Sequence, residues 1–176
     1  MHWCGGFLIV LLVVCALGDS RAELLSITAS NTTHYLYDSL GRVRLFHGVN
    51  IVEKQFPWYD VSLLKYDVVA QLAAVGVNVV RVGFMWTGAE PTPGQFNMTY
   101  YEIMRSIVTN LADHGIYALL DVHQDCLSAL FCLYDGFPPW VIKKSIPHRA
   151  FPWPFHGPCS SRAWATNELT EAAGQV

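Results

Sequence analysis

The chain has 176 residues, which is long enough for one domain with a substantial hydrophobic core. With 52% hydrophobic and 14% charged residues, it is richer in apolar groups than an average soluble domain. The net charge is −3 and the sequence has no basic cluster, which argues against a protein that binds nucleic acids.

Residues 1–22 predict a signal peptide. The unbroken apolar run at residues 7–17 has the length of a signal sequence and is shorter than the roughly 20 residues that a membrane span needs. Small residues follow it in patterns that a signal peptidase can cleave. A signal anchor is the alternative, but the run is short and no second apolar segment follows. We therefore expect secretion, to the extracellular space, a digestive lumen or the lysosome, with residues 23–176 as the mature part.

Two N-glycosylation sequons, at Asn31 and Asn97, agree with secretion, although Asn97 also suits a helix N-cap. Signal cleavage would leave three cysteines in an oxidising compartment, and an odd number means one free thiol or an absent partner. Their spacing does not match a zinc site. A local disulfide and a longer one are both open alternatives among Cys126, Cys132 and Cys159.

The apolar patterns that follow alternate between strand and helix. Gly76 and Gly115 suit the left-handed residue that ends a helix. The alternation predicts an α/β fold with a parallel sheet and right-handed crossovers. Within residues 33–52 we expect a hairpin, with strands at 35–37 and 42–49, that leads into a strand. After it we expect a helix at 60–74, a strand at 77–84, a helix at 98–114 and a strand at 116–122.

Residues 131–158 depart from this alternation. The segment is rich in proline and aromatic residues, which predicts a long loop or cover rather than a helix–strand unit. A helical pattern then begins at residue 164.

Polar residues accompany the end of each apolar strand. In parallel α/β folds the ligand site lies beyond the carboxyl ends of the strands, so these residues predict one shared site rather than scattered core groups. At the third strand they alternate, which points them to one face. The residues are His47, Asn50 and Lys54 after the first strand, Arg81 and Trp86 at the second, and Asp121, His123 and Asp125 at the third.

The chemistry of these residues suits sugar binding. Asp121 and Asp125 can accept hydrogen bonds from sugar hydroxyls, and Lys54 can donate to them. Trp86 can stack on a sugar ring, and a packing role suits it equally well. None of these residues is an obvious nucleophile or general acid.

Arg81 can orient a neighbouring carboxylate and lower its pKa, and His123 can bond a hydroxyl or hold a carboxylate in place. A rival interpretation takes Asp121, His123 and Asp125 as ligands of a divalent ion in a dinuclear hydrolase. No close histidine cluster adjoins them, so we predict neither a metal nor a cofactor.

Two sets of motifs resemble a known family. The first resembles the opening of a family 5 glycoside hydrolase and consists of His47-Gly48-Val49-Asn50, Asn78-Val79-Val80-Arg81 and Glu90-Pro91 through Gly94. The second is more selective and is similar to the endoglycoceramidase branch, which cleaves the oligosaccharide from the ceramide of glycosphingolipids. It combines Lys54 with Asp121-Val122-His123-Gln124-Asp125, Phe131-Cys132 and Pro139-Trp140.

The resemblance covers residues 33–176 and implies a (β/α)8 TIM barrel that acts with retention. Such an enzyme needs two carboxyl groups about 5 Å apart, which in this family are glutamates after strands four and seven. The chain would supply about three of the βα units and neither glutamate. Because Asn167-Glu168 is followed by Leu169, we do not assign Glu168 as the acid/base. We expect an N-terminal portion that is inactive alone.

By matching motif, Arg81 would support the nucleophile, and sugar binding would fall to Lys54, Asp121, His123 and Asp125. The resemblance implies a glycosphingolipid or other glycoside as partner, contact with a membrane surface through that substrate, and a monomer when complete. Two alternatives are a short form that binds sugar or glycolipid without cleaving it, and a family 5 hydrolase that acts on a polysaccharide.

Overall fold

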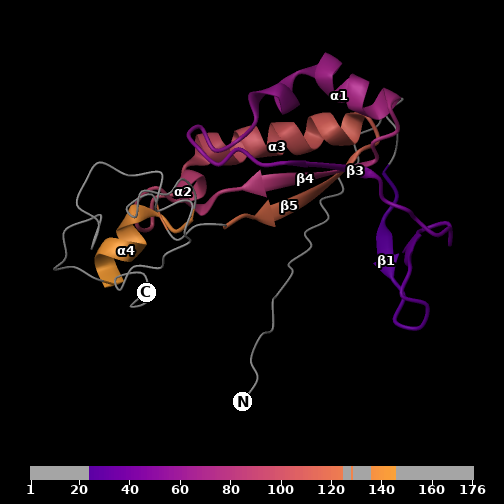
Figure 1. The fold of residues 1–176 in the computed structure, drawn as a ribbon, viewed down its shortest axis with the longest axis horizontal. Helices are drawn as coiled ribbons and strands as arrows, with labels where there is room; N and C mark the ends of the chain where they lie inside the picture. Colours follow the sequence, from indigo (N-terminus) through magenta and orange to yellow (C-terminus); the bar gives the residue numbers. More distant parts are fainter. Residues whose placement is uncertain (1–23, 125–127, 129–135, 146–176) are drawn as a thin grey trace, which may run out of the picture. The chain divides into compact units, whose positions relative to one another are not determined.

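The computed structural model describes residues 24–124, 128 and 136–145 (Figure 1). The predicted signal peptide, Asp125, the three cysteines and the helix expected from residue 164 lie outside the described residues. The elements are β1 (Ile27–Ala29), β2 (Leu36–Asp38), β3 (Gly48–Ile51), the 3-10 helix η1 (Val61–Leu64), α1 (Tyr66–Ala74), β4 (Val79–Phe84), α2 (Trp86–Ala89), α3 (Met98–Asp113), β5 (Tyr117–Val122) and α4 (Pro139–Ser145).

The central sheet has the strand order β3-β4-β5. The amide of Tyr117 donates to the carbonyl of Asn78 over 2.9 Å, and six positions further along both strands His123 donates to Phe84 over 3.2 Å. A register that advances equally along both strands defines a parallel pair. The predicted α/β fold with a parallel sheet is therefore confirmed.

The chain divides into two compact units. The first comprises residues 1–50, 62–82 and 107–120, and the second comprises 51–61, 83–106 and 121–176. In the first unit, α1 and the last part of α3 cover one face of the strands (Figure 1). The buried apolar residues of this unit are Leu63, Val69, Val77, Val80, Val82, Ile107, Leu111, Ile116 and Tyr117.

Three predicted elements are confirmed with small shifts of their ends. Strands β4 and β5 and helix α3 lie within one or two residues of their expected bounds. Asn97 caps α3, because its side-chain oxygen accepts a hydrogen bond from the Tyr100 amide over 3.2 Å. Gly76 ends α1 in the left-handed conformation, with φ +86°, as expected.

The helix expected at residues 60–74 is interrupted. Lys65 is extended, with φ −90° and ψ 122°, and separates η1 from α1. The carbonyl of Leu63 accepts a hydrogen bond from the side-chain amide of Asn110 over 2.8 Å. This carbonyl therefore bonds to a distant part of the chain at the point where the helix is interrupted.

The expected hairpin forms only in its first residues. The Asp38 amide donates to the Arg42 carbonyl over 3.0 Å, the Arg44 amide donates to the Leu36 carbonyl over 2.8 Å, and Tyr37 and Val43 form an antiparallel bridge. The turn lies where the sequence predicts it, and the buried carboxylate of Asp38 supports it by accepting hydrogen bonds from the Leu40 and Arg42 amides and from the Arg42 guanidinium. The predicted second strand does not continue to residue 49, because β3 begins separately at Gly48, and β2 also pairs antiparallel with β1, which the sequence analysis did not predict.

Burial opposes ionisation of Asp38, but the hydrogen bonds from Arg42 and Leu40 outweigh it and lower the pKa of this carboxyl. The Arg44 guanidinium also lies 3.0 Å from the Asp38 carboxylate.

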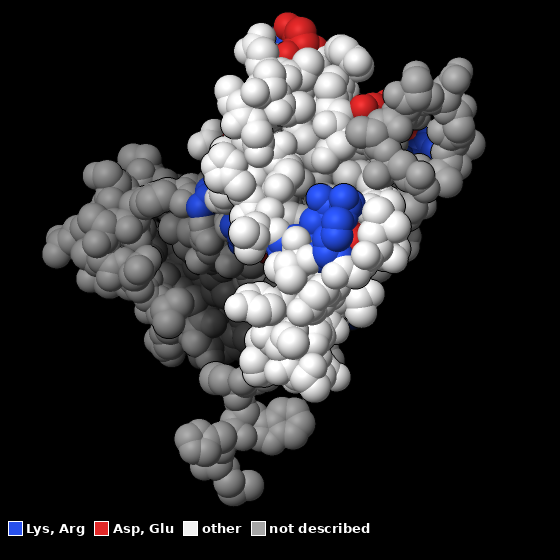
Figure 2. Space-filling view, turned by 90° about the vertical axis from the view of Figure 1, so that its right-hand side faces the viewer, with Lys and Arg blue, Asp and Glu red and all other residues white. Residues whose placement is uncertain are grey.

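Among the described residues that Figure 2 shows, most are uncharged, with one prominent group of Lys or Arg atoms near the centre and a group of Asp or Glu atoms at the top. This agrees with the low content of charged residues.

The proline-rich segment contains a helix that the sequence interpretation missed. α4 spans Pro139–Ser145, so residues 131–158 are not a continuous loop. Pro139 is compatible with this position because the first helical residue needs no amide hydrogen. No helix in the part of the chain that the structure describes is long and apolar enough to span a membrane.

Candidate functional site

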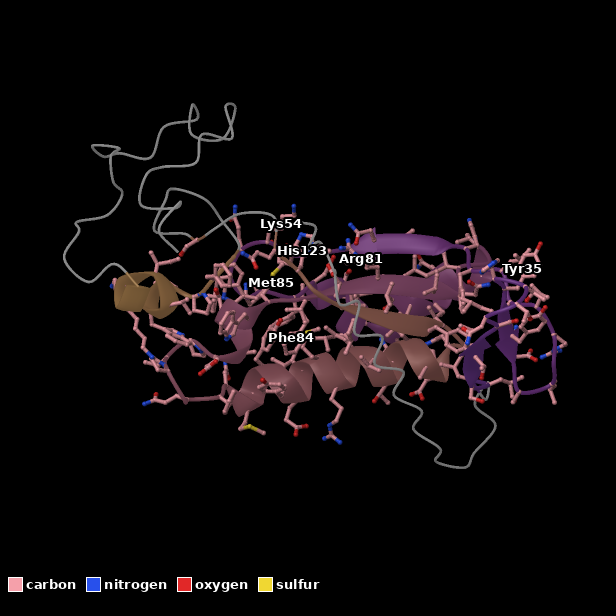
Figure 3. All side chains as sticks on the ribbon, turned by 90° about the horizontal axis from the view of Figure 1, so that it is seen from below. Tyr35, Lys54, Arg81, Phe84, Met85 and His123 are labelled. Atoms are coloured by element: carbon pink, nitrogen blue, oxygen red, sulfur yellow. The ribbon has the colours of Figure 1, made fainter. Side chains whose placement is uncertain are left out.

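The second unit brings three strand ends together. The His123 amide bonds to the Phe84 carbonyl, which places the end of β5 beside the end of β4. Segment 51–54 continues β3, which lies on the other side of β4 in the strand order β3-β4-β5, and a Cβ at Gly83 would come within 2.8 Å of the Val52 side chain. Lys54 and His123 consequently lie at the same end of the strands (Figure 3). The expected gathering of these two residues is observed.

Asp121 and His123 form a bonded pair. His123 Nδ1 lies 2.7 Å from Asp121 Oδ2, and the side chains are 8% and 21% exposed for His123 and Asp121. The intervening Val122 is 73% exposed. Strand alternation therefore places the two polar groups on one face, as predicted. A carboxylate bonded to one ring nitrogen fixes the orientation of the imidazole and directs its other nitrogen.

Arg81 lies in the first unit and bonds to a different partner. Its guanidinium donates to the side-chain oxygen of Asn50 over 2.8 Å. This hydrogen bond joins Arg81 to Asn50, two of the residues that the sequence analysis placed at strand ends. The role of Arg81 beside a nucleophile stays a prediction.

The sequence interpretation placed His47 at the end of the first strand, and this was wrong. β3 begins at Gly48, so His47 precedes the strand. Its ring nitrogen Nδ1 lies 3.3 Å from the carbonyl of Gly76, and its amide bonds to the side-chain oxygen of Asn78. His47 therefore belongs to the amino end of the strand, away from its carboxyl end.

Trp86 is held by a network centred on Glu90. The Trp86 indole donates to one carboxylate oxygen of Glu90 over 2.8 Å, and the Gly94 amide donates to the other over 2.8 Å. The Glu90 carbonyl accepts a hydrogen bond from the Trp140 indole over 3.0 Å. The Trp86 ring packs edge-on against Phe137 and Trp140. The geometry favours the packing role for Trp86 and identifies Glu90 as the residue that shapes this loop.

These hydrogen bonds make the loop sensitive to acid. The bonds from Trp86 and then Gly94 lower the pKa of Glu90 below its ordinary 4.5, although burial opposes the shift. A lowered folded-state pKa contributes stability that is complete above the unfolded pKa and is lost as pH falls through the folded value. We expect the melting temperature of the wild type to fall more than that of Glu90→Gln between about pH 6 and pH 3.

Thermal unfolding followed by circular dichroism at each pH measures this difference. Glu102→Gln is the matched control, because Glu102 makes an exposed ion pair with Arg105, and such pairs contribute little. The control should follow the wild-type pH profile. Identical profiles for Glu90→Gln and the wild type would contradict the role given to the Glu90 carboxylate.

The arrangement can bind hydroxyl-rich ligands through a cation, a carboxylate and an imidazole. Among the residues that the structure describes, no group of three or more His, Cys, Asp and Glu could hold a metal ion. Asp125, the third member of the alternative metal set, lies outside the described residues, as do Cys126, Cys132 and Cys159.

Comparison with known proteins identifies a family match. The cellulase family, glycosyl hydrolase family 5, matches residues 41–152, which include the strand ends described above. An endoglycoceramidase from Hydra vulgaris is 34% identical over 189 aligned residues, covering 96% of this chain and 36% of the relative. The chain spans about a third of the length of the curated relatives it matches.

Two solved structures agree with this match. The crystal structure of an endogalactoceramidase shares 28% identity with a TM-score of 0.57, covering 68% of this chain and 30% of that protein. Endo-glycoceramidase II from Rhodococcus sp., in complex with ganglioside GM3, shares 27% identity with a TM-score of 0.53, covering 65% of this chain and 28% of that protein. The α/β fold described here corresponds to part of the TIM barrel of these relatives.

Proposed function

Because the chain belongs to glycosyl hydrolase family 5, we propose that it is part of a retaining enzyme that cleaves the bond between oligosaccharide and ceramide in glycosphingolipids. The observation that carries this proposal is the bonded pair Asp121–His123 at the carboxyl end of β5, in a chain similar to endoglycoceramidases. An imidazole fixed in this way offers a directed hydrogen bond to a sugar hydroxyl or to a catalytic carboxylate.

Lys54 and Asp121 complete the proposed sugar contacts in the described part of the site. An ammonium group donates to hydroxyls, a carboxylate accepts from them, and the two together suit a polyhydroxylated ring. Asp125, outside the described residues, is expected to add a second carboxylate. In the first unit, Arg81 is proposed to support the nucleophile.

Retention requires an acid/base and a nucleophile, two carboxyl groups about 5 Å apart. We expect the two glutamates on barrel strands other than β3, β4 and β5, so that residues 1–176 alone bind glycolipid without cleaving it.

The apolar run at residues 7–17 supports secretion. Asn31 and Asn97 are exposed, as glycosylation sites must be.

The test compares two substrates on the protein isolated from its source. Ganglioside GM3 in detergent micelles is offered beside carboxymethylcellulose, and released reducing sugar is measured. We expect hydrolysis of the ganglioside only. Hydrolysis of the polysaccharide instead would favour the alternative family 5 substrate, and ganglioside binding without hydrolysis would favour a non-catalytic binding protein.

A further inference from the structure

One buried hydroxyl joins the loop that carries Lys54 to the end of β4. Tyr100, in the first turn of α3, is 2% exposed. Its hydroxyl accepts a hydrogen bond from the Met85 amide over 2.9 Å and donates one to the Trp58 carbonyl over 3.2 Å. Trp58 belongs to the loop between β3 and η1, and Met85 directly follows β4. All of these residues lie in the second unit.

The loop needs such support because its backbone is strained. Trp58 has φ +73°, a left-handed conformation that is unfavourable for a residue with a side chain. Phe56, two residues earlier, is 84% exposed, so its side chain contributes little packing. The Trp58 amide bonds to the Gln55 carbonyl over 2.7 Å, which closes a local turn but does not attach it to the rest of the unit.

The Tyr100 ring is confined on several sides. A Cβ at Gly88 would lie 2.8 Å from Cε2 of the ring, so α2 approaches the ring closely only because residue 88 is glycine. Phe84 packs edge-on against the ring with centroids 5.3 Å apart, and Tyr59 lies 6.3 Å away. Burial raises the pKa of Tyr100 to about 12, which keeps the hydroxyl protonated and able to donate.

We propose that Tyr100 is a positioning residue for the sugar site. It fixes the loop that presents Lys54 and, at the same time, the end of β4. Phe84, which precedes Met85, accepts the amide hydrogen of His123, so the same strand end also locates the imidazole (Figure 3). The assignment of Lys54 and His123 as sugar contacts rests on the proposed function, whereas the attachment of the loop through the Tyr100 hydroxyl does not.

The first test needs no substrate. Tyr100→Phe removes the hydroxyl and keeps the ring, and Tyr101→Phe is the matched control, because its hydroxyl makes none of the bonds described above. We expect limited trypsin cleavage after Lys54 to be faster by on the order of tenfold in Tyr100→Phe, at a temperature where both variants are folded. Tyr101→Phe should change the rate less than about twofold. Equal rates in the two variants would overturn the proposal.

The second test uses the whole enzyme of the proposed function, with ganglioside GM3 in micelles. A purely structural role would lower the melting temperature without changing KM well below that temperature. We expect KM to rise by about fivefold or more in Tyr100→Phe, and an unchanged KM would overturn the positioning of the sugar contacts. A further outcome is faster trypsin cleavage in Tyr100→Phe while neither the wild type nor any variant binds GM3. It would support the attachment of the loop through the Tyr100 hydroxyl and contradict the proposed function.

A second variant covers the case in which Tyr100→Phe does not fold. Gly88→Ala keeps the hydroxyl but forces the Tyr100 ring to shift, because the added Cβ occupies its space. We expect it to accelerate cleavage after Lys54 in the same direction. A folded Gly88→Ala protein with the wild-type cleavage rate would count against the proposal.

Discussion

Replacement of His123 by alanine in the whole enzyme of the proposed function is expected to lower kcat/KM for ganglioside GM3 on the order of 100-fold. The imidazole is 8% exposed and bonded at 2.7 Å to Asp121, so its orientation is fixed before a ligand arrives. A preorganised hydrogen-bonding group loses little entropy on binding, which is why its removal costs more than the loss of a mobile surface group. Initial rates of reducing-sugar release at several GM3 concentrations measure the change.

Two further variants separate this effect from a general loss of structure. Val122→Ala changes the neighbouring residue, which is 73% exposed, and should leave kcat/KM within about twofold of the wild type. Asp121→Asn keeps an acceptor near the imidazole and should give a smaller loss than His123→Ala. A His123→Ala protein with wild-type kcat/KM would contradict the role proposed for His123 in the site.

The second large effect concerns the core. Ile107→Ala is expected to reduce the free energy of unfolding by about 2–5 kcal/mol, because truncation of a fully buried side chain leaves a cavity. Ile107 is 0% exposed and lies on the face of α3 that also carries Tyr100, Met104 and Leu111. This spacing forms a continuous apolar stripe along one side of the helix.

Urea denaturation followed by tryptophan fluorescence measures the loss. Ile103→Ala is the matched control, since it makes the same chemical change in the same helix at a partly exposed position. It should cost clearly less than Ile107→Ala. Equal losses in the two variants would contradict the assignment of the buried face of α3.

The elements that the sequence predicted well are those with a local cause. β4 and β5 follow from uninterrupted apolar runs, and α3 follows from helical spacing closed by a glycine. The Asp121–His123 pair follows from strand alternation alone, because residues two apart share a face. No knowledge of distant contacts is needed for any of these features.

The features that sequence reasoning missed depend on distant contacts. The break before α1 coincides with a bond between Leu63 and Asn110, and the arrangement around Trp86 depends on a bond between Glu90 and Trp140. In the sequence, Tyr100 is simply one member of an apolar helical stripe. Only the structure shows that its hydroxyl bonds to Met85 and Trp58.

The most direct test of the proposed function is the mass of the products from a GM3 digest. The proposal predicts two products from one cleavage, the intact oligosaccharide and free ceramide, with no shorter glycolipid at early times. Mass spectrometry of the aqueous and organic phases distinguishes these products. A released single sugar together with a correspondingly shortened glycolipid would show cleavage at the other end of the glycan and would contradict the proposed function.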